Sequence, residues 1–422
     1  MEIEESGKIQ DRAVLVGLNA DCFTKEQTAT EETLEELEAL LETPGGFCTA
    51  KVLQNRHTPD SHSFIGEGKA QEVRMLVEAT ESTMVIFDNE LSPGNIRALE
   101  EIIGVPVLDR STLILDIFAQ RAKTREGRLQ VELAQNKYLL PRLSGMGNSL
   151  SRQGGGIGTR GPGETKLESD RRHIRERINR LEGELSQVRQ VRGVQRERRM
   201  KNAVPVVAIV GYTNAGKSTL LNQLTGAGIP ANNRLFDTLD TTSRQLKVSD
   251  NLDVILSDTV GFIAKLPHHL VDAFRATLEE LQYADLLLHV IDASDPNRQA
   301  HMEVVEKLTA TLAKPGTPVI YCYNKADLVS REELPTGENV IAVSAAKGQG
   351  MEQLLALIEK NLGKTLHHVV LCLPYSMGGQ VEALHSGAKV HGVEYTAQGI
   401  EVEAVLDEIF YGRLQQYVTK EI

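Results

Sequence analysis

Residues 204–219 read VPVVAIVGYTNAGKST, and this stretch decides the fold of the central part of the chain. Its first seven residues form a nearly continuous apolar run, which is typical of a strand buried on both faces of a parallel sheet. The next eight, Gly211 to Ser218, match the pattern G-x-x-x-x-G-K-[ST], and a helical stretch, STLLNQLTG, follows. A strand, a glycine-rich turn and a helix in this order predict a phosphate-binding loop.

The chemistry of this loop follows from its residue types. The glycines let main-chain N–H groups wrap around a phosphate, and the N-terminus of the following helix adds a favourable dipole. We expect Lys217 to reach the β- and γ-phosphate oxygens and the Ser218 hydroxyl to bind Mg²⁺. The residues predicted to bind nucleotide here are Gly211, Tyr212, Thr213, Asn214, Ala215, Gly216, Lys217, Ser218 and Thr219.

A second element closes the next apolar strand, LDVILS. It is Asp258-Thr259-Val260-Gly261, and we expect all four residues to lie at the nucleotide. A carboxylate at Asp258 can hold Mg²⁺ through water, and the Gly261 amide can approach the γ-phosphate. The D-x-x-G pattern becomes informative because it follows a phosphate-binding loop and a strand.

Two further elements predict recognition of guanine. Asn324-Lys325-Ala326-Asp327 ends the strand PVIYCY, and an Asp327 carboxylate can accept from both N1–H and the exocyclic amine of guanine. Adenine would leave that acid unpaired, which disfavours it. Ser344-Ala345-Ala346 ends the next strand and suits a main-chain contact to the guanine carbonyl oxygen. We therefore expect GTP and GDP rather than ATP.

The rest of the chain predicts an α/β, multidomain protein. A length of 422 residues suggests roughly three domains, and the pattern gives four parts. The runs RAVLVGLN, FCTAKVLQ, MVIFDN and VPVLD alternate with helical patterns, which predicts a largely parallel sheet, with N-caps at Thr30, Ser92 and Ser111. The parts are an N-terminal α/β domain (1–115), a basic helical hairpin (116–201), a P-loop GTPase domain (202–364) and a small C-terminal α/β domain (365–422).

The hairpin is predicted from a long helix, 111–143, a Gly- and Ser-rich tip, 144–165, and a second helix, 167–200. In the second helix, Ile174, Ile178, Leu181, Leu185, Val188 and Val191 form a narrow apolar stripe.

Charge is distributed unevenly. The chain has 46 Lys and Arg against 58 Asp and Glu, but residues 121–201 hold 20 against 9, a net charge of +11. The remainder holds 26 against 49, a net charge of −23. The tip residues Arg152, Arg160 and Lys166 stand among glycines with few acids, which suits RNA contact through shape and charge. The alternative is a solvated brace whose Arg residues pair with neighbouring Glu.

Several protein classes are excluded by composition. The four cysteines lie far apart and form no C-x-x-C pair, which argues against a disulfide framework or a zinc site. The N-terminus is acidic and lacks the apolar segment of a secretory signal, and no apolar run has the length of a membrane span. We expect a monomeric cytoplasmic protein with no membrane span.

The order of the motifs carries a resemblance. GYTNAGKS, FDTLDTTSR, DTVGF, NKAD and SAA, after GGGIGTRGPGETKLE, resemble the HflX family of translation-factor-related GTPases. The resemblance implies that Thr238 is the switch threonine, which binds Mg²⁺ and joins Lys217 and Gly261 in catalysis. By residue type alone, Thr241 and Thr242 are equal candidates. The switch residues implied at the nucleotide are Phe236, Asp237, Thr238, Leu239 and Asp240.

The same resemblance implies a partner and a task. Members of the family bind the large ribosomal subunit and can split stalled ribosomes, with the helical arm reaching towards the peptidyl-transferase region. The family usually reads FATLDPT where this chain has Asp237 and Thr241 in place of Ala and Pro. Two alternatives are a ribosome-assembly GTPase and a nucleotide-gated RNA-binding module whose hydrolysis is incidental.

Three positions near the motifs need separate interpretation. Phe262 follows Gly261, where Ras-like enzymes place a water-orienting Gln, so it either packs beneath the switch or leaves the site without a water-positioning side chain. Both can hold, and we expect slow unassisted hydrolysis. His268 and His269 are interpreted as surface residues rather than catalytic ones. Cys322, inside an apolar strand, is expected to be a small core residue.

Overall fold

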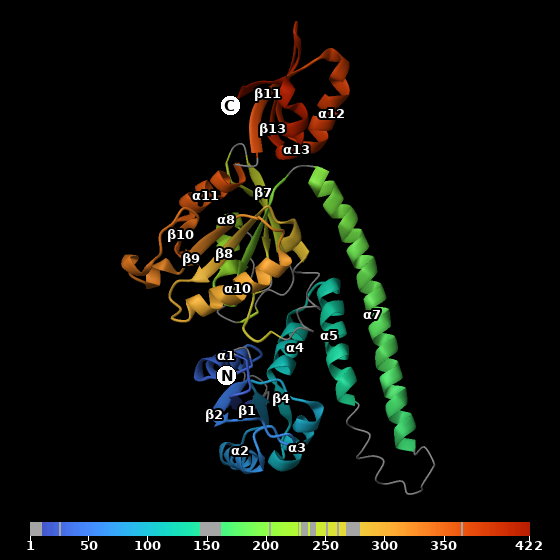
Figure 1. Ribbon diagram of the computed structural model, residues 1–422, viewed down its shortest axis with the longest axis vertical. Coiled ribbons are helices and arrows are strands. Elements are labelled where there is room, and N and C mark those ends of the chain that lie inside the picture. Colours follow the sequence, from blue (N-terminus) through green and yellow to red (C-terminus); the bar gives the residue numbers. More distant parts are fainter. Residues whose placement is uncertain are drawn as a thin grey trace, which may run out of the picture. The chain divides into compact units, whose positions relative to one another are not determined.

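In the computed structural model (Figure 1), packing divides the chain into two compact units. The first holds residues up to 185 together with 235–236 and 264–266, and the second holds the remainder. Within the residues that the structure describes, the first unit has one sheet and the second has two. The structure describes residues 11–24, 27–143, 162–201, 204–226, 228, 235–236, 242–249, 252–259, 261–266, 279–363 and 366–422.

The first unit is a four-stranded parallel sheet with helices between its strands, as the strand–helix alternation predicts. The strand order is β2-β1-β3-β4, and Val14, Val16 and Leu18 of β1 pack in one core cluster with Val73 of α2 and Leu99 of α3. The elements are β1 (Arg12–Ala20), α1 (Glu31–Glu42), β2 (Phe47–Arg56), α2 (Glu67–Thr80), β3 (Met84–Phe87), α3 (Pro93–Ile103), β4 (Val107–Asp109) and α4 (Arg110–Arg121).

Helix caps in this unit confirm two of three expected positions. Thr30 caps α1 and Ser92 caps α3, each accepting a main-chain N–H three residues on. The expected cap at Ser111 is wrong. Asp109 caps α4 instead, accepting the Thr112 N–H at 2.9 Å, because it already stands at the end of β4 with its carboxylate turned to the helix start.

The single long helix expected over 111–143 is also wrong. The chain makes α4 and then α5 (Arg125–Leu143), with Ala122 in an extended conformation between them. Thr124 explains the break, because its hydroxyl accepts the Gly127 N–H at 3.0 Å and so starts a new helix. The second hairpin helix, α7 (Pro162–Lys201), begins earlier than expected, within the predicted tip. Proline suits the first helical position because it needs no N–H partner there.

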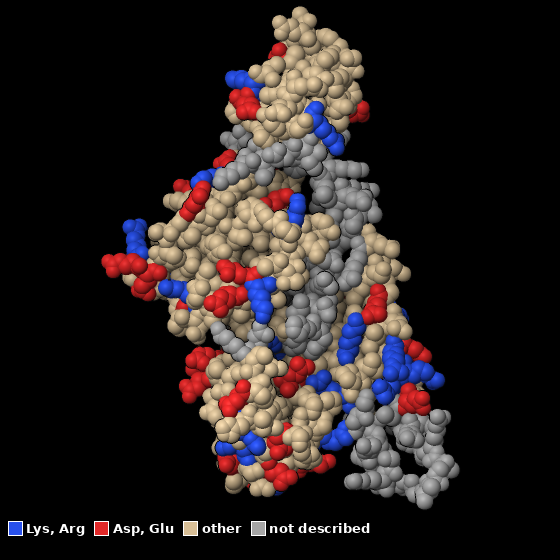
Figure 2. All heavy atoms as spheres, in the orientation of Figure 1, with Lys and Arg blue, Asp and Glu red and all other residues tan. Residues whose placement is uncertain are grey.

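Within the first unit, α5 and the first part of α7 form a hairpin tied by ion pairs. Glu132 pairs with Arg177 at 2.5 Å and Lys137 with Glu182 at 2.7 Å, while Leu181 and Leu185 of the predicted stripe are buried. Figure 2 shows Lys and Arg mixed with Asp and Glu on this surface. The neighbouring pairs predicted for a brace lie within α7, where Arg172 pairs with Glu176 and Arg180 with Glu184, each at 3.9 Å. Val191 at the end of the stripe is exposed.

The second unit is built around a six-stranded sheet of order β10-β9-β8-β5-β7-β6, in which only the β6–β7 pair is antiparallel. Leu220 of α8 and Ile358 of α11 join its main core, and Met302 of α10 packs on Ile291 and Tyr323. The elements are β5 (Val206–Gly211), α8 (Lys217–Thr225), β6 (Thr242–Lys247), β7 (Asp253–Asp258), β8 (Leu286–Asp292), α10 (Arg298–Leu312), β9 (Val319–Asn324), β10 (Val340–Ala342) and α11 (Met351–Gly363).

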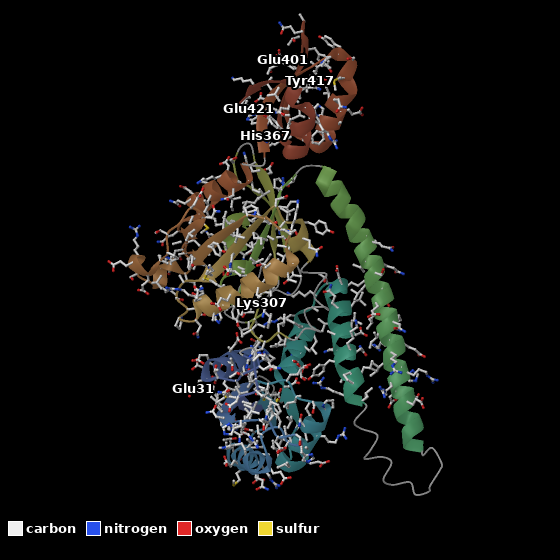
Figure 3. All side chains as sticks on the ribbon, viewed as in Figure 1. Glu31, Lys307, His367, Glu401, Tyr417 and Glu421 are labelled. Carbon is white, nitrogen blue, oxygen red and sulfur yellow. The ribbon has the colours of Figure 1, made fainter. Side chains whose placement is uncertain are left out.

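The C-terminal part is a four-stranded antiparallel sheet of order β12-β13-β11-β14. Figure 3 labels His367, Glu401, Tyr417 and Glu421 on it, and the His367 ring stacks on Tyr411 with centroids 3.7 Å apart. No helix in the described ranges has the length and apolar character needed to cross a bilayer. The elements are β11 (Leu366–Leu373), α12 (Gly378–Gly387), β12 (Lys389–Thr396), β13 (Gly399–Asp407), α13 (Glu408–Leu414) and β14 (Val418–Glu421).

Candidate active site

The predicted motifs meet at one edge of the six-stranded sheet. Parallel strands end at the same edge, so the ends of β5, β7 and β9 bring together Gly211, Asp258 and Asn324. This is the edge at which open α/β sheets bind ligands.

Two positions of the loop between β5 and α8 have backbone conformations and close contacts that favour glycine. Gly211 has a φ of 156°, and a Cβ there would lie 2.3 Å from the Val290 carbonyl oxygen. Gly216 has a φ of 91°, and a Cβ would lie 2.2 Å from Asn324 Nδ2. These two glycines let the loop turn tightly before α8 begins at Lys217.

Lys217 is buried inside this loop. Its Nζ donates to the Tyr212 carbonyl at 2.7 Å and to the Gly211 carbonyl at 3.1 Å. Burial lowers the pKa of Lys217 to about 8, and the charge of Asp258 opposes the shift. An ammonium group held in a dry loop beside a helix N-terminus suits a phosphate counter-charge.

Two of the residues expected near Mg²⁺, Ser218 and Asp258, have side chains that suit a magnesium ion. The Ser218 hydroxyl donates to Asp258 Oδ2 at 3.1 Å, so a hydroxyl oxygen and a carboxylate lie together at the end of β7. Magnesium prefers such hard oxygen ligands, and when bound it would neutralise charge on the β- and γ-phosphate oxygens.

Gly261 and Phe262 lie directly against the phosphate-binding loop. The Thr213 N–H donates to the Phe262 carbonyl at 2.7 Å, and the Phe262 N–H donates to the Gly211 carbonyl at 3.2 Å. Phe262 is only 2% exposed, and a Cβ at Gly261 would lie 3.0 Å from Lys217 Nζ. Phe262 thus packs as the simpler interpretation expected, and its apolar side chain has no group that could orient water.

The base-recognition motifs are tied to the same loop. Asn324 donates from Nδ2 to the Ala215 carbonyl at 2.9 Å and accepts the Ala345 N–H at 3.0 Å through Oδ1. Hydrogen bonds from Ser344 and Lys347 lower the pKa of Asp327, and the Lys347 ammonium lies 3.0 Å from its carboxylate. The carboxylate is therefore an ionised acceptor, as guanine recognition requires.

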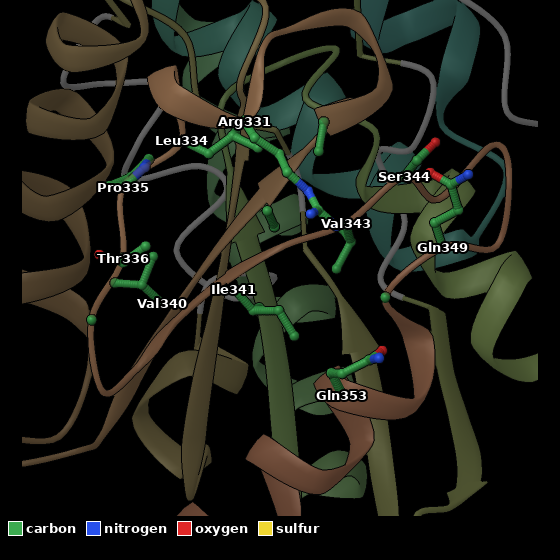
Figure 4. A pocket seen from close by; sticks show the side chains of 14 residues that line it. Arg331, Leu334, Pro335, Thr336, Val340, Ile341, Val343, Ser344, Gln349 and Gln353 are labelled. Carbon is green, nitrogen blue, oxygen red and sulfur yellow. The ribbon is translucent and has the colours of Figure 1, made fainter.

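A pocket opens beside these loops (Figure 4). Its wall includes Ala326 and Ser344 from the base-recognition motifs and Val340 from the edge strand β10, with Arg331 and Gln353 around it. The pocket therefore reaches from the guanine-recognition elements to the edge of the sheet.

Several predicted site residues fall outside the described part of the chain, and their roles stay predictions. Phe236 is described: it is buried, and its ring packs edge-on against Phe118 with centroids 4.7 Å apart. The side chain of Lys166 is not described, although the residue belongs to α7. Outside the described residues lie Arg152, Arg160, Asp237, Thr238, Leu239, Asp240, Thr241, Val260, His268 and His269.

Sequence reasoning missed a buried charge network in the first unit. Lys265, four residues after Gly261, forms an ion pair with Asp88 at the end of β3, and Arg110 binds the same carboxylate at 2.9 Å. Arg110 also pairs with Glu36 and donates to the Ala264 carbonyl at 3.2 Å. Burial lowers the pKa of Lys265, with Asp88 opposing. None of these four residues belongs to a recognised motif, so the sequence carries no signal for their contacts.

Comparison with known proteins covers most of the chain. A model described as "GTP-binding GTPase N-terminal" matches residues 31–119, one described as "GTP-binding GTPase Middle Region" matches 121–199, and one described as "50S ribosome-binding GTPase" matches 206–325.

Relatives named GTPase HflX match over nearly the full length. The protein of Caldanaerobacter subterraneus subsp. tengcongensis is 47% identical over 99% of this chain and 96% of its own. The protein of Alkalihalophilus pseudofirmus is 45% identical over 97% of this chain and 98% of its own. The protein of Escherichia coli K12 is 44% identical over 86% of this chain and 86% of its own. With a phosphate-binding loop and guanine-recognition motifs at one sheet edge, the chain belongs to the HflX family of GTPases and is a GTP hydrolase.

Proposed function

We propose that this GTPase binds the large ribosomal subunit in the cytoplasm and couples GTP binding and hydrolysis to the splitting or rescue of ribosomes. The observation that carries the proposal is Phe262. Its side chain is buried and apolar, and its main chain is hydrogen-bonded to the phosphate-binding loop. A residue so held cannot orient water, so water positioning must come from another residue or from a partner, and we propose the partner.

The match of residues 206–325 to a model described as "50S ribosome-binding GTPase" supports the large subunit as that partner. The hairpin supports it independently. Residues 121–201 carry a net charge of +11, while described cations such as Arg177 and Lys137 are neutralised by Glu132 and Glu182 across the two helices. We infer that the paired part is a stalk and that Arg152, Arg160 and Lys166 contact ribosomal RNA.

The first test is the GTP hydrolysis rate with and without purified large subunits. A group supplied by the partner should accelerate hydrolysis by about 10³-fold or more. Small subunits at the same concentration serve as the control. A protein that already reaches its maximal rate alone would contradict the proposal.

Sedimentation separates the alternative tasks. Splitting predicts that intact ribosomes disappear when protein and GTP are added, but not with GDP. An assembly GTPase would bind free large-subunit precursors and leave intact ribosomes unchanged. An RNA-binding module would bind naked RNA without either effect.

The stalk and tip have their own test. Changing Arg152, Arg160 and Lys166 to Gln should weaken ribosome binding and reduce its salt dependence by about one unit of log–log slope per lost phosphate contact. Nucleotide affinity should not change. The matched control changes three exposed cations of the second unit, Lys307, Lys314 and Lys360, to Gln. Equal salt slopes in wild type and tip variant would leave the hairpin as a brace only.

A further inference from the structure

Two stacked rings lie at the phosphate-binding loop, and the chemistry described above assigns a role to neither ring. The ring of Tyr212 stacks on that of His301, with centroids 3.7 Å apart and planes 7° from parallel. Tyr212 is the second residue of the loop and is 7% exposed, whereas the His301 side chain, in the first turn of α10, is 26% exposed. The stack therefore joins the loop to a neighbouring helix.

The main chain of Tyr212 holds the phosphate-binding lysine. Its carbonyl accepts from Lys217 Nζ at 2.7 Å, which is shorter than the 3.1 Å from the same nitrogen to the Gly211 carbonyl, and from the Ala215 N–H at 3.3 Å. The stacked ring and the carbonyl that accepts from Lys217 belong to the same residue, so the stack restrains the residue that holds the ammonium group.

His301 is itself held in place. Its Nδ1 lies 3.0 Å from Asp295 Oδ2, and the other carboxylate oxygen of Asp295 accepts the Asn297 N–H at 2.8 Å. The hydrogen bond with His301 is the main cause that keeps the pKa of Asp295 below its usual range. An ionised acid anchored by the turn thus orients the imidazole ring against Tyr212.

The same segment also touches the base-recognition motif. Asp292, at the end of β8, pairs with Lys325 at 2.6 Å, and the Ala293 N–H donates to the Asn324 carbonyl at 2.9 Å. Residues 292–301, which we call the β8–α10 bracket, therefore contact the phosphate-binding loop at one end and the guanine-recognition motif at the other.

We propose that His301 is a positioning residue for nucleotide binding, which acts by stacking on Tyr212 and so fixing the carbonyl that holds Lys217. The proposal rests on GTP binding at this loop and is independent of the ribosomal task. It adds a determinant of affinity that lies outside every nucleotide-binding motif.

These contacts also predict whether loss of the stack changes nucleotide affinity or the rate of hydrolysis. Tyr212 lies in a parallel β-bridge with Phe262, but the two hydrogen bonds of that bridge are made by the flanking residues Gly211 and Thr213 and use neither the Tyr212 ring nor the carbonyl that holds Lys217. Loss of the stack should therefore loosen the phosphate contact, common to GDP and GTP, and leave the Phe262 segment in place. Affinity for both nucleotides should fall while kcat at saturating GTP stays within about twofold.

The test measures Kd and dissociation rate of fluorescent GDP and GTP for wild type and variants. His301→Ala should weaken both affinities about 2- to 12-fold, which is the interaction free energy of one aromatic pair expressed as a change in Kd. His301→Phe keeps a ring face but not the bond to Asp295, and should stay within about twofold of wild type. Tyr212→Ala should match His301→Ala, and the double variant should be no weaker than the weaker single one.

The matched control is His57→Ala. His57 also pairs with an aspartate, Asp21, at 2.7 Å, but its side chain is 98% exposed and lies in the first unit. It should leave both affinities unchanged. If His301→Ala does not fold, His301→Leu, which keeps apolar volume without an aromatic face, takes its place.

The proposal is overturned if the alanine or leucine variant binds GDP as tightly as wild type, if His301→Phe loses as much affinity as the non-aromatic variant, or if the effects of Tyr212→Ala and His301→Ala add in full. None of these outcomes depends on ribosomes, so failure here leaves the ribosomal proposal standing.

Discussion

The buried lysine of the phosphate-binding loop should make nucleotide affinity depend on pH. Burial lowers the pKa of Lys217 to about 8, whereas a phosphate against the ammonium group would raise it again. GDP therefore binds the protonated form and drives proton uptake once the free lysine has lost its proton. Affinity should be constant below pH 7 and fall as pH rises through about 8.

The size of the effect follows from the fraction protonated. That fraction falls from about nine-tenths at pH 7 to about one-quarter at pH 8.5, so GDP should bind about fourfold more weakly at the higher pH. The same shift means that the unfolded chain binds more protons than the nucleotide-free folded protein. This group should therefore make the free protein more stable as pH rises from about 8 towards the ordinary lysine pKa.

Fluorescent GDP titrations between pH 7 and 8.5 measure the affinity change. Calorimetry in buffers of different ionisation enthalpy measures proton uptake, expected to be about 0.8 proton per GDP at pH 8.5 and about 0.1 at pH 7. Lys217→Ala is the control, which should bind GDP and GTP more weakly and retain only the pH dependence of other groups. Constant affinity and no proton uptake in wild type would refute the reasoning.

Three further predictions concern single contacts. Asp327→Asn should lose its preference for guanine nucleotides and gain binding of xanthine nucleotides, because an amide donates where the carboxylate only accepts. Competition between GDP and xanthosine diphosphate measures this preference, and an unchanged preference for GDP would contradict the prediction. Asp88→Ala removes the carboxylate that Arg110 and Lys265 share, and should lower the free energy of unfolding, measured by urea titration, by about 3–5 kcal/mol. In the same assay the control Asp21→Ala, at an exposed pair, should lower it by less than about 1 kcal/mol. Equal losses would contradict the expectation that the buried Asp88 carboxylate stabilises the fold more than an exposed one. Gly216→Ala places a Cβ 2.2 Å from Asn324 Nδ2 at a φ of 91° and should weaken GDP binding by about tenfold or more, while Gly226→Ala, at a φ of 64° with nothing within 4 Å, should leave GDP affinity unchanged.

Alternation of apolar runs with helical patterns was enough to predict the parallel sheet of the first unit. Each run, such as RAVLVGLN or MVIFDN, is short and bounded by turn residues, so strand and helix periods do not overlap. The helix after β4 was harder. Periodicity continues from 111 to 143, but Thr124 offers its hydroxyl to the Gly127 N–H and divides the pattern into two helices. A single capping hydrogen bond therefore accompanies the break between α4 and α5, which the apolar periodicity does not reveal.

The site divides in the same way between contacts that a motif encodes and contacts that only folding creates. Lys217 binds carbonyls five and six residues before it, and glycine spacing alone implies that geometry. Asn324 binds Ala215 across 109 residues, and motif order still implied their meeting because both follow strands that end at one sheet edge.

Lys265 and His301 belong to neither class. Lys265 meets Asp88 across 177 residues, and His301 meets Tyr212 from the first turn of a helix that carries no motif. Their residue types are common on solvated surfaces, and only packing reveals that one is buried in an ion network and the other stacked on a ring. The motif residues are the ones predicted to contact nucleotide, and that role can be inferred from their chemistry and spacing in the sequence. A residue that acts through a motif residue has no chemical signature of its own in the sequence. The role that we propose for His301, which stacks on Tyr212, could therefore be inferred only from the structure.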